Sequence, residues 1–249
     1  MFKAKEDKTT GVRLFDFDSS SEPLGEAFRM LRLQIEAALD SSTRKRSSTI
    51  LITSSVQSEG KTTVSCNLAR VCAIAKVPTL LMDADFRKPM VHEAFGIHRK
   101  PGITDLLLED IPDSIPIQPI EDCNLSVLPA GKSIKHTTEI LGSPAFDNLL
   151  EKLRNRFKLI IIDSPPAGIV SDAGVLARKV EAIYIVVRAG STNSRLVEKT
   201  IRSLKDLGGN VKGIIMSRID ARRDRYYYHH YYPQYYSKYY RSDLPKETP

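Results

Sequence analysis

The chain alternates between short apolar runs and longer amphipathic stretches. Six of the apolar runs are rich in β-branched residues and leucine and predict buried strands. These runs are TILITS (49–54), PTLLMDAD (78–85), LSVLPAG (125–131), KLIIIDSPP (158–166), AIYIVVRAG (182–190) and KGIIMS (212–217). Stretches with helical periodicity lie between them, at 61–75, 143–157, 170–180 and 193–208. Because strands and helices alternate and the strand runs are continuously apolar, the pattern predicts an α/β fold with a doubly wound, mainly parallel sheet.

A further amphipathic helix is predicted ahead of the first strand, over residues 21–40. Ser21 can cap this helix, and Pro23 suits its first turn. Apolar side chains recur along it at spacings that place them on one helical face. These side chains are Leu24, Phe28, Leu31, Ile35 and Leu39.

The tyrosines are concentrated at one end of the chain. Of the ten tyrosines, only Tyr184 lies in an apolar run. The others are Tyr226, Tyr227, Tyr228, Tyr231, Tyr232, Tyr235, Tyr236, Tyr239 and Tyr240. We predict a flexible segment over 1–20, one domain over 21–220 and a disordered tail over 221–249. The tail phenols could stack on single-stranded nucleic acid, form an adhesive segment without a specific role, or serve as substrates, and the tail alone leaves all three open.

The composition narrows the class of protein. With 249 residues and 41% hydrophobic content, the chain can bury the core of one α/β domain. The net charge is +7, of which the six Lys/Arg and three Asp/Glu from Arg222 onward contribute +3, so the charge is spread out and argues only weakly for nucleic acid. The three cysteines lack metal-type spacing and predict reduced thiols. No signal peptide or spanning segment is evident, so we expect a cytoplasmic protein that reaches a membrane through a partner.

A phosphate-binding loop is predicted between the first strand and the helix that follows it. SVQSEGKTT (55–63) fits the P-loop pattern, although Ser55 stands where the first glycine usually is. Backbone amides of such a loop can surround a phosphate, and the lysine can reach the β- and γ-phosphates. The threonine after the lysine would ligate Mg²⁺. The predicted nucleotide-binding residues here are Ser58, Glu59, Gly60, Lys61, Thr62 and Thr63.

Carboxylates follow two other predicted strands. Asp163 ends the run LIII, and Asp83 and Asp85 end the run PTLLM. Since the carboxyl ends of parallel strands share one edge of a sheet, these side chains are expected to meet the loop. Thr62, Asp85 and Asp163 are the predicted metal ligands of a Mg²⁺–nucleotide site.

Together these motifs resemble those of a known family. The set SSVQSEGKTT, LLMDADFRKP and LIIIDSPP, followed by a tyrosine cluster, resembles the bacterial tyrosine kinases of polysaccharide export, with their Walker A, A′ and B motifs. PGITDLLL (101–108) and TEILGSPAF (138–146) also resemble segments of that family. The resemblance covers roughly residues 20–240, nearly the whole chain, and implies the P-loop fold shared with the septum-positioning and partitioning ATPases (MinD/ParA-like).

The resemblance implies a protein-tyrosine kinase that uses ATP and Mg²⁺. Lys61 would gather the γ-phosphoryl group, and Asp83 or Asp85 would accept the tyrosine proton, with Asp83 preferred. Arg87 would add positive charge at the phosphates. The substrates would be the chain's own tail tyrosines, phosphorylated in trans, and the kinase would regulate capsule or exopolysaccharide synthesis and export.

The resemblance also implies partners. GEAFRMLRLQI carries Glu26, Arg29 and Arg32 in the pattern that joins subunits of these kinases into a ring. A chain without a spanning segment looks like the separate form of the kinase. It would dock at the inner face of the plasma membrane on a transmembrane adaptor of the polysaccharide co-polymerase type, and a cognate tyrosine phosphatase would reverse its phosphorylation. No nucleic-acid partner is expected.

The alternative is an ATPase switch of the MinD/ParA-like class without kinase activity. The loop of that class carries a second lysine five residues before the invariant one, where this chain has Val56. That class also gives no role to a tyrosine tail. Two departures from the kinases stand beside this: SIKHTTEIL lacks their Pro-Pro-Asn-Pro-like segment, and Ser217 replaces an asparagine near the base.

Overall fold

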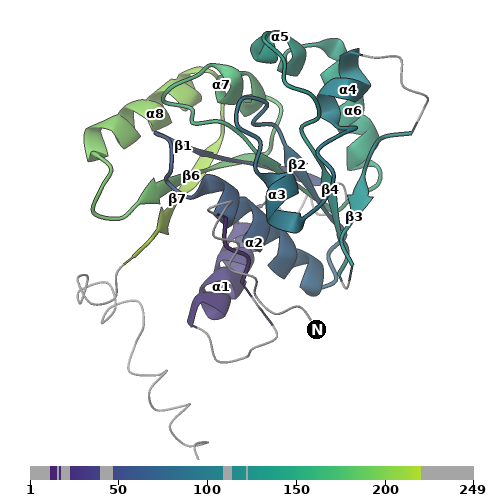
Figure 1. The fold of residues 1–249 in the computed structure, drawn as a ribbon. Coiled ribbons are helices and arrows are strands. Elements are labelled where there is room, and N and C mark those ends of the chain that lie inside the picture. Colours follow the sequence, from purple (N-terminus) through teal and green to yellow (C-terminus); the bar gives the residue numbers. More distant parts are fainter. Residues whose placement is uncertain are drawn as a thin grey trace, which may run out of the picture.

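The computed structural model describes residues 12–15, 17, 23–39, 47–108, 114–121 and 123–219. A seven-stranded sheet runs through this part of the chain in the order β3-β4-β2-β5-β1-β6-β7 (Figure 1). The strands are β1 (Ser48–Ser54), β2 (Thr79–Asp83), β3 (Gln118–Pro119), β4 (Leu125–Leu128), β5 (Leu159–Asp163), β6 (Ala182–Arg188) and β7 (Val211–Ser217).

The predicted mainly parallel sheet is confirmed. Every neighbouring pair of strands is parallel except β3 with β4, which is antiparallel. All six predicted strands form, within a few residues of their predicted bounds. The seventh, β3, was not predicted, because it has only two residues and one of them is a proline.

Helices cover both faces of the sheet (Figure 1). Along β1 the side chains alternate: Ile50 and Ile52 join the cluster that contains α1 and α2, whereas Leu51 joins the cluster that contains α6, α7 and α8. All three are fully buried, which explains why the strands are apolar at every position. The helices are α1 (Pro23–Ala38), α2 (Lys61–Ile74), α3 (Val91–Phe95), α4 (Ile103–Leu108), α5 (Thr137–Leu141), α6 (Pro144–Arg154), α7 (Asp172–Ala177) and α8 (Ser194–Asp206).

Helix α1 packs as its periodicity predicts, with one exception. Phe28, Ile35 and Leu39 are buried against the α2 side of the core. Phe28 also contacts the ring of Phe17, with the two centroids 6.0 Å apart in an edge-on arrangement. Leu24 is 44% exposed, because it lies in the first turn, at the end of the apolar face.

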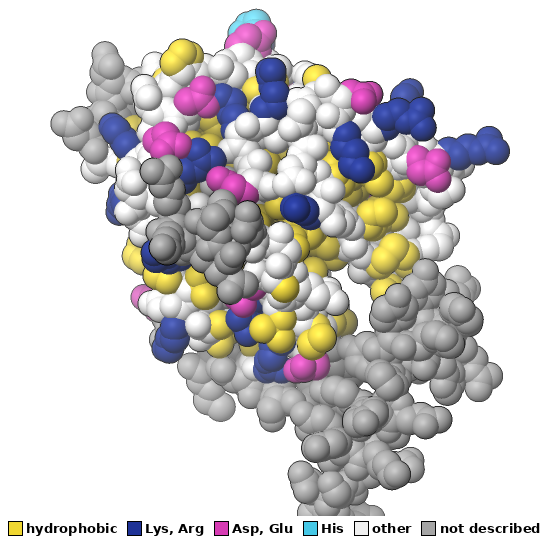
Figure 2. Space-filling model, turned by 180° about the vertical axis from the view of Figure 1, so that it is seen from behind, with side chains coloured by type: hydrophobic (Ala, Val, Ile, Leu, Met, Phe, Trp, Pro, Cys, Tyr) yellow, Lys and Arg dark blue, Asp and Glu magenta, His cyan; other side chains and the backbone are white. Residues whose placement is uncertain are grey.

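Strand β7 is an edge strand, and its burial differs from that of the central strands. Its residues alternate between partly buried and exposed. Ile214 and Met216 lie on the exposed side. From the back of the molecule, apolar side chains gather in patches between charges of both signs (Figure 2). No helix among the described residues is long and apolar enough to cross a bilayer.

The middle of the sheet brings the three predicted motifs together. Strand β5 lies between β1 and β2, and the register pairs Asp163 with Ile52 on one side and with Asp83 on the other. The phosphate loop leaves β1 at the same edge. Ligands of doubly wound sheets bind at the carboxyl ends of such strands, so this edge is the candidate site.

Candidate active site

The loop between β1 and α2 turns sharply at two residues. Gly60 has φ of +91° and Ser58 has φ of +61°, both in the left-handed region. Gly60 adopts this conformation without strain, whereas a serine does so only when other contacts hold it. Helix α2 then begins at Lys61, so that Lys61 and Thr62 lie in its first turn, at its positive end.

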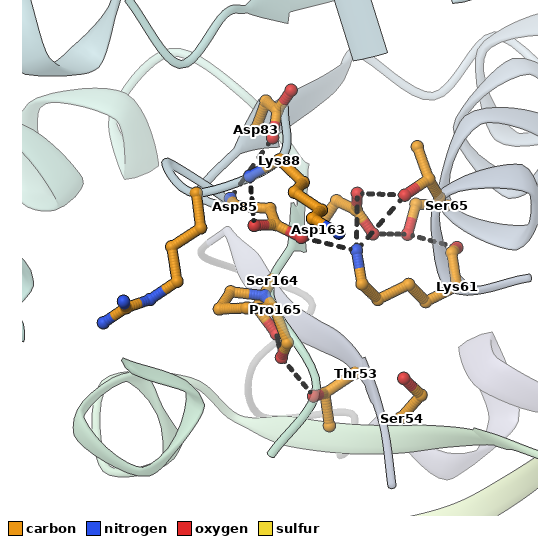
Figure 3. Close-up of polar contacts among 12 residues, drawn as sticks. Thr53, Ser54, Lys61, Ser65, Asp83, Asp85, Lys88, Asp163, Ser164 and Pro165 are labelled. Atoms are coloured by element: carbon orange, nitrogen blue, oxygen red, sulfur yellow. Dashed lines mark hydrogen bonds and ion pairs between the residues drawn. The ribbon is translucent and has the colours of Figure 1, made fainter. Parts of the chain in front are cut away.

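Lys61 is surrounded by carboxylates. Its Nζ lies 2.8 Å from Asp85 Oδ2 and 3.9 Å from Asp163 Oδ2 (Figure 3). Burial lowers the pKa of Lys61, but the charges of Asp163 and Asp85 outweigh burial and hold the pKa above its usual value. The lysine is therefore a fixed cation at neutral pH, placed to meet anionic phosphates.

Asp163 is fully buried and held by hydroxyl donors. Thr62 Oγ1 donates to its Oδ2 at 2.8 Å, and Ser65 Oγ donates to its Oδ1 at 2.9 Å. Burial raises the pKa of Asp163, and Lys61 and the Thr62 hydrogen bond reduce that shift. The structure thus joins the threonine of the first motif to the aspartate of the third. Ser65, one helical turn after Lys61, was not singled out from the sequence.

Asp83 and Asp85 differ in their surroundings. Asp83 is fully buried, and its two oxygens accept the backbone amides of Asp85 and Val91, each at 3.2 Å. Burial raises the pKa of Asp83 well above its usual range, and the charge of Asp163 raises it further. Asp85 lies beyond the end of β2 and faces Lys61. Of the two predicted bases, Asp83 is held by backbone amides, and Asp85 contacts Lys61 directly.

Three carboxylates and one hydroxyl lie around Lys61, and their chemistry suits a hard divalent cation. Asp83, Asp85 and Asp163 supply three buried carboxylates against one lysine, and the Thr62 hydroxyl adjoins them. Oxygen donors and excess negative charge suit Mg²⁺. Within the described ranges, no three acidic, histidine or cysteine side chains could hold a metal by themselves. Mg²⁺ characteristically takes one or two carboxylates and completes its shell with phosphate oxygens and water.

The structure pairs Arg87 with side chains of α5 and α7, whereas the sequence predicted a role for it at the phosphates. Its Nε donates to Asp172 Oδ2 at 2.9 Å, and its Nη2 donates to Thr137 Oγ1 at 2.9 Å. Thr138 also donates to Asp172, at 2.7 Å. Burial raises the pKa of Asp172, but the hydrogen bonds from Arg87 and the two threonines outweigh burial and hold that pKa below its usual value. Arg87 therefore links the loop after β2 to α5 and α7.

The segment after β5 braces the phosphate loop. Thr53 Oγ1 donates to Pro165 O at 2.9 Å (Figure 3), and the Ala167 amide donates to Ser54 O at 2.8 Å. A methyl group on Gly168 would lie 2.2 Å from the carbonyl oxygen of Ser55. Gly168 is thus required by a close backbone approach, which the sequence did not indicate.

The predicted oligomerisation residues lie on α1. Arg29 donates to Glu26 at 3.2 Å and to the carbonyl of Phe17 at 2.9 Å. Arg32 donates to Glu36 at 2.8 Å. The side chains of Glu26 and Arg29 remain 36% exposed and Arg32 21% exposed, so all three can reach a neighbouring molecule. The nine tail tyrosines lie outside the described residues.

Comparisons with known protein sequences find relatives that match most of the chain. A family model described as an AAA domain matches residues 48–205. The putative tyrosine-protein kinase CapB of Staphylococcus aureus is 32% identical over 224 residues, which are 89% of this chain and 97% of CapB. The tyrosine-protein kinase CpsD of Streptococcus pneumoniae is 35% identical over 71% of this chain and 78% of its own length. Another relative, the tyrosine-protein kinase ptk of Acinetobacter johnsonii, is longer, and this chain spans 28% of it.

Solved structures include domains with a similar fold. The kinase domain of the Escherichia coli tyrosine kinase ETK superposes with a TM-score of 0.75 at 29% identity, over 83% of this chain and 81% of that domain. The chimerical protein CapA2B2 gives a TM-score of 0.76 at 30% identity, over 84% and 92% of the two chains. MinD of Aquifex aeolicus gives a TM-score of 0.60 at 24% identity, over 72% and 73%, and shares the fold alone.

Proposed function

Since the chain belongs to the bacterial tyrosine-protein kinases, we propose that it transfers the γ-phosphoryl group of ATP to tyrosines of its own C-terminal tail. The observation that carries this proposal is the joining of Lys61 and Thr62 to the carboxylates of two other strand ends. The greater likeness to kinase domains than to MinD favours phosphotransfer over an ATPase switch.

Different residues of the site have different roles in the proposed reaction. The loop amides and Lys61 bind and orient the phosphates. Bound Mg²⁺, held by Thr62 with Asp163 and Asp85, would neutralise charge on the β- and γ-phosphates. The tyrosine oxygen forms a new bond to the γ-phosphorus while the bond to ADP breaks, and ADP leaves. A phenol has a pKa of about 10, so its proton needs an acceptor. Asp83 or Asp85 takes that proton.

We propose that the tail reacts in trans within a ring built through Glu26, Arg29 and Arg32. Each phosphate adds about −1.5 to −2 charges, so several phosphates would turn a basic tail acidic. Repulsion between neighbouring tails would then loosen the ring. A transmembrane adaptor of the co-polymerase type would dock the kinase at the membrane and activate it, a cognate phosphatase would reset the tail, and the cycle would regulate polysaccharide synthesis and export.

The test is incubation of the full chain with Mg·ATP, with and without the cytosolic peptide of a candidate adaptor. Mass spectrometry of the C-terminal peptides is expected to find phosphate on residues 226–240, and Lys61→Met is expected to abolish it. Light scattering before and after phosphorylation follows the assembly. Hydrolysis of ATP with no phosphotyrosine under any condition would instead support the ATPase switch.

A further inference from the structure

Glu59 places a carboxylate inside a loop whose task is to bind anions. The side chain is 1% exposed. Its Oε2 accepts the amides of Ser55 and Val56, at 2.8 and 2.9 Å. A carboxylate aimed at the phosphates would repel them, so the direction in which these bonds hold it decides its role.

The other carboxylate oxygen of Glu59 leaves the phosphate loop altogether. Oε1 accepts the Arg188 amide at 3.3 Å, at the last residue of β6, and the Thr192 hydroxyl at 2.5 Å, in the segment between β6 and α8. The backbone carbonyl of Glu59 accepts Ser217 Oγ at 2.5 Å, at the end of β7. One residue thus ties the loop to the ends of two strands on the side away from β5 and β2.

The backbone conformation on either side of Glu59 shows why its hydrogen bonds matter for the loop. Ser58 before it and Gly60 after it both have positive φ. A serine in that conformation is unfavourable unless surrounding contacts hold it. The bonds of Glu59 act at the point between these two residues.

We propose that Glu59 is a positioning residue, which holds the phosphate loop in its binding conformation from behind and makes no contact with nucleotide. Its carboxylate occupies the amides of Ser55 and Val56 and so leaves the later loop amides and the start of α2 for the phosphates. Thr192 anchors the far side of the carboxylate. This inference deepens the proposed function, on whose nucleotide site it rests, and replaces direct nucleotide binding as the role of the Glu59 side chain.

The test compares nucleotide affinity across a graded set of variants of the full chain. Glu59→Ala removes every side-chain bond, and Glu59→Gln keeps one accepting oxygen but turns an amide group toward N–H donors. Calorimetry with Mg·ADP and Mg·ATP is expected to show both affinities about tenfold or more weaker for Glu59→Ala, by the same factor, with Glu59→Gln between it and the wild type. Glu198→Gln, an exposed carboxylate on α8, is the matched control and should leave both unchanged.

Variants of Thr192 provide a second, milder test in case Glu59→Ala does not fold. Thr192→Val removes one hydroxyl at the anchor and should weaken both nucleotides by about threefold to tenfold, whereas Thr192→Ser keeps the hydroxyl and should restore affinity. In adaptor-activated kinase assays, both Thr192→Val and Glu59→Gln should raise KM for ATP and leave kcat nearly unchanged. Without nucleotide, the backbone amides of residues 55–61 should exchange hydrogen faster in these variants than in the wild type. With saturating ADP, the exchange rates should be equal.

Three outcomes would overturn the proposal. Lowered melting temperatures with unchanged nucleotide affinity would make Glu59 a general stabilising residue. Loss of ATP affinity alone, with ADP binding intact, would place its carboxylate at the γ-phosphate. A fall in kcat at unchanged KM would assign it to the chemical step. Nucleotide binding is read separately from phosphotransfer, so an absence of tyrosine phosphorylation in the wild type would refute the proposed function without deciding the role of Glu59.

Discussion

The ammonium nitrogen of Lys61 lies 2.8 Å from Asp85 Oδ2, so the phosphate-loop lysine is paired with a side chain from a neighbouring motif. Phosphates that enter the loop must compete with Asp85 for this cation. A divalent cation removes the competition, because it can bind the carboxylate and leave the lysine to the phosphates. We therefore expect this pair to contribute to a metal dependence of nucleotide binding.

Asp85→Asn is expected to change the affinity for ATP in opposite directions with and without Mg²⁺, each relative to the wild type. Without Mg²⁺, ATP should bind about tenfold more tightly to the variant than to the wild type, because one repelling charge is gone and Lys61 is released. With Mg²⁺, the variant should bind more weakly, because a ligand of the metal is lost. Calorimetry in EDTA and in excess Mg²⁺ measures both. Glu93→Gln, an exposed carboxylate on α3, is the control, and equal losses in both buffers would contradict the competition.

Asp163→Asn is expected to stabilise the nucleotide-free fold while it abolishes phosphotransfer. Burial raises the pKa of Asp163, so the folded state binds more protons than the unfolded state and the wild type loses stability as pH rises. The Thr62 and Ser65 hydroxyls can turn to satisfy an amide. The melting temperature at pH 8 should rise by about 2–4 °C per kcal/mol gained, and the gain should shrink toward pH 5. A lower melting temperature of the variant at both pH values would show that burial of the charged Asp163 carboxylate does not destabilise the fold.

Arg87→Ala is expected to destabilise the domain in a pH-dependent way. The Asp172 side chain is fully buried and loses its ion-pair partner. The Arg87 side chain is 44% exposed, so solvent screening limits the cost to about 1–2 kcal/mol. The Asp172 pKa is depressed, so its contribution is present above the usual carboxyl range and is lost as pH falls through the depressed value. Urea unfolding at pH 7 and pH 3 should give a smaller difference at pH 3. A pH-independent difference would mean that packing, not the ion pair, is responsible.

Gly168→Ala is expected to disturb the phosphate loop from outside. The added methyl group would lie 2.2 Å from Ser55 O, a backbone atom that cannot move without shifting the loop. We expect a loss of about 1–3 kcal/mol in urea unfolding together with weaker nucleotide binding. Gly213→Ala serves as the control, because its nearest neighbours are Tyr184 ring atoms at 3.5 Å. Unchanged nucleotide affinity in Gly168→Ala would show that the segment after β5 does not support the loop.

Replacement of Glu26, Arg29 and Arg32 by alanine is expected to leave the chain monomeric. Their partly exposed charges would pair with a neighbouring subunit, and the intrahelical pairs seen on α1 are worth only about 0.3–0.5 kcal/mol each. Light scattering at several protein concentrations should show assembly for the wild type and none for the triple variant.

The matched control for that experiment changes three charges on another helix. Alanine at Arg195, Glu198 and Arg202 of α8 removes a similar number of charges and should leave assembly intact. Equal loss of assembly in the two triple variants would show that net charge, rather than the α1 pattern, governs association.

Part of the site could be predicted because its chemistry is local in the sequence. Lys61 and Thr62 follow a strand and open a helix, and Asp163 ends another strand, so their meeting at one sheet edge follows from parallel strands alone. The partners of Glu59 and Arg87 could not be predicted in this way. Thr192 is 133 residues from Glu59, and Asp172 is 85 residues from Arg87, and no periodicity or motif links them.

Local patterns in the sequence specify the class of fold, the phosphate loop and the carboxylates at the strand ends, because apolar runs and short motifs encode which segments are buried and where strands stop. The order of the strands depends on tertiary packing, which places β5 between β1 and β2 and so sets which carboxylate meets Lys61. The same packing pairs Arg87 with Asp172 and the Glu59 carboxylate with Thr192. Such contacts depend on how distant segments pack, and many packings are compatible with the same local pattern.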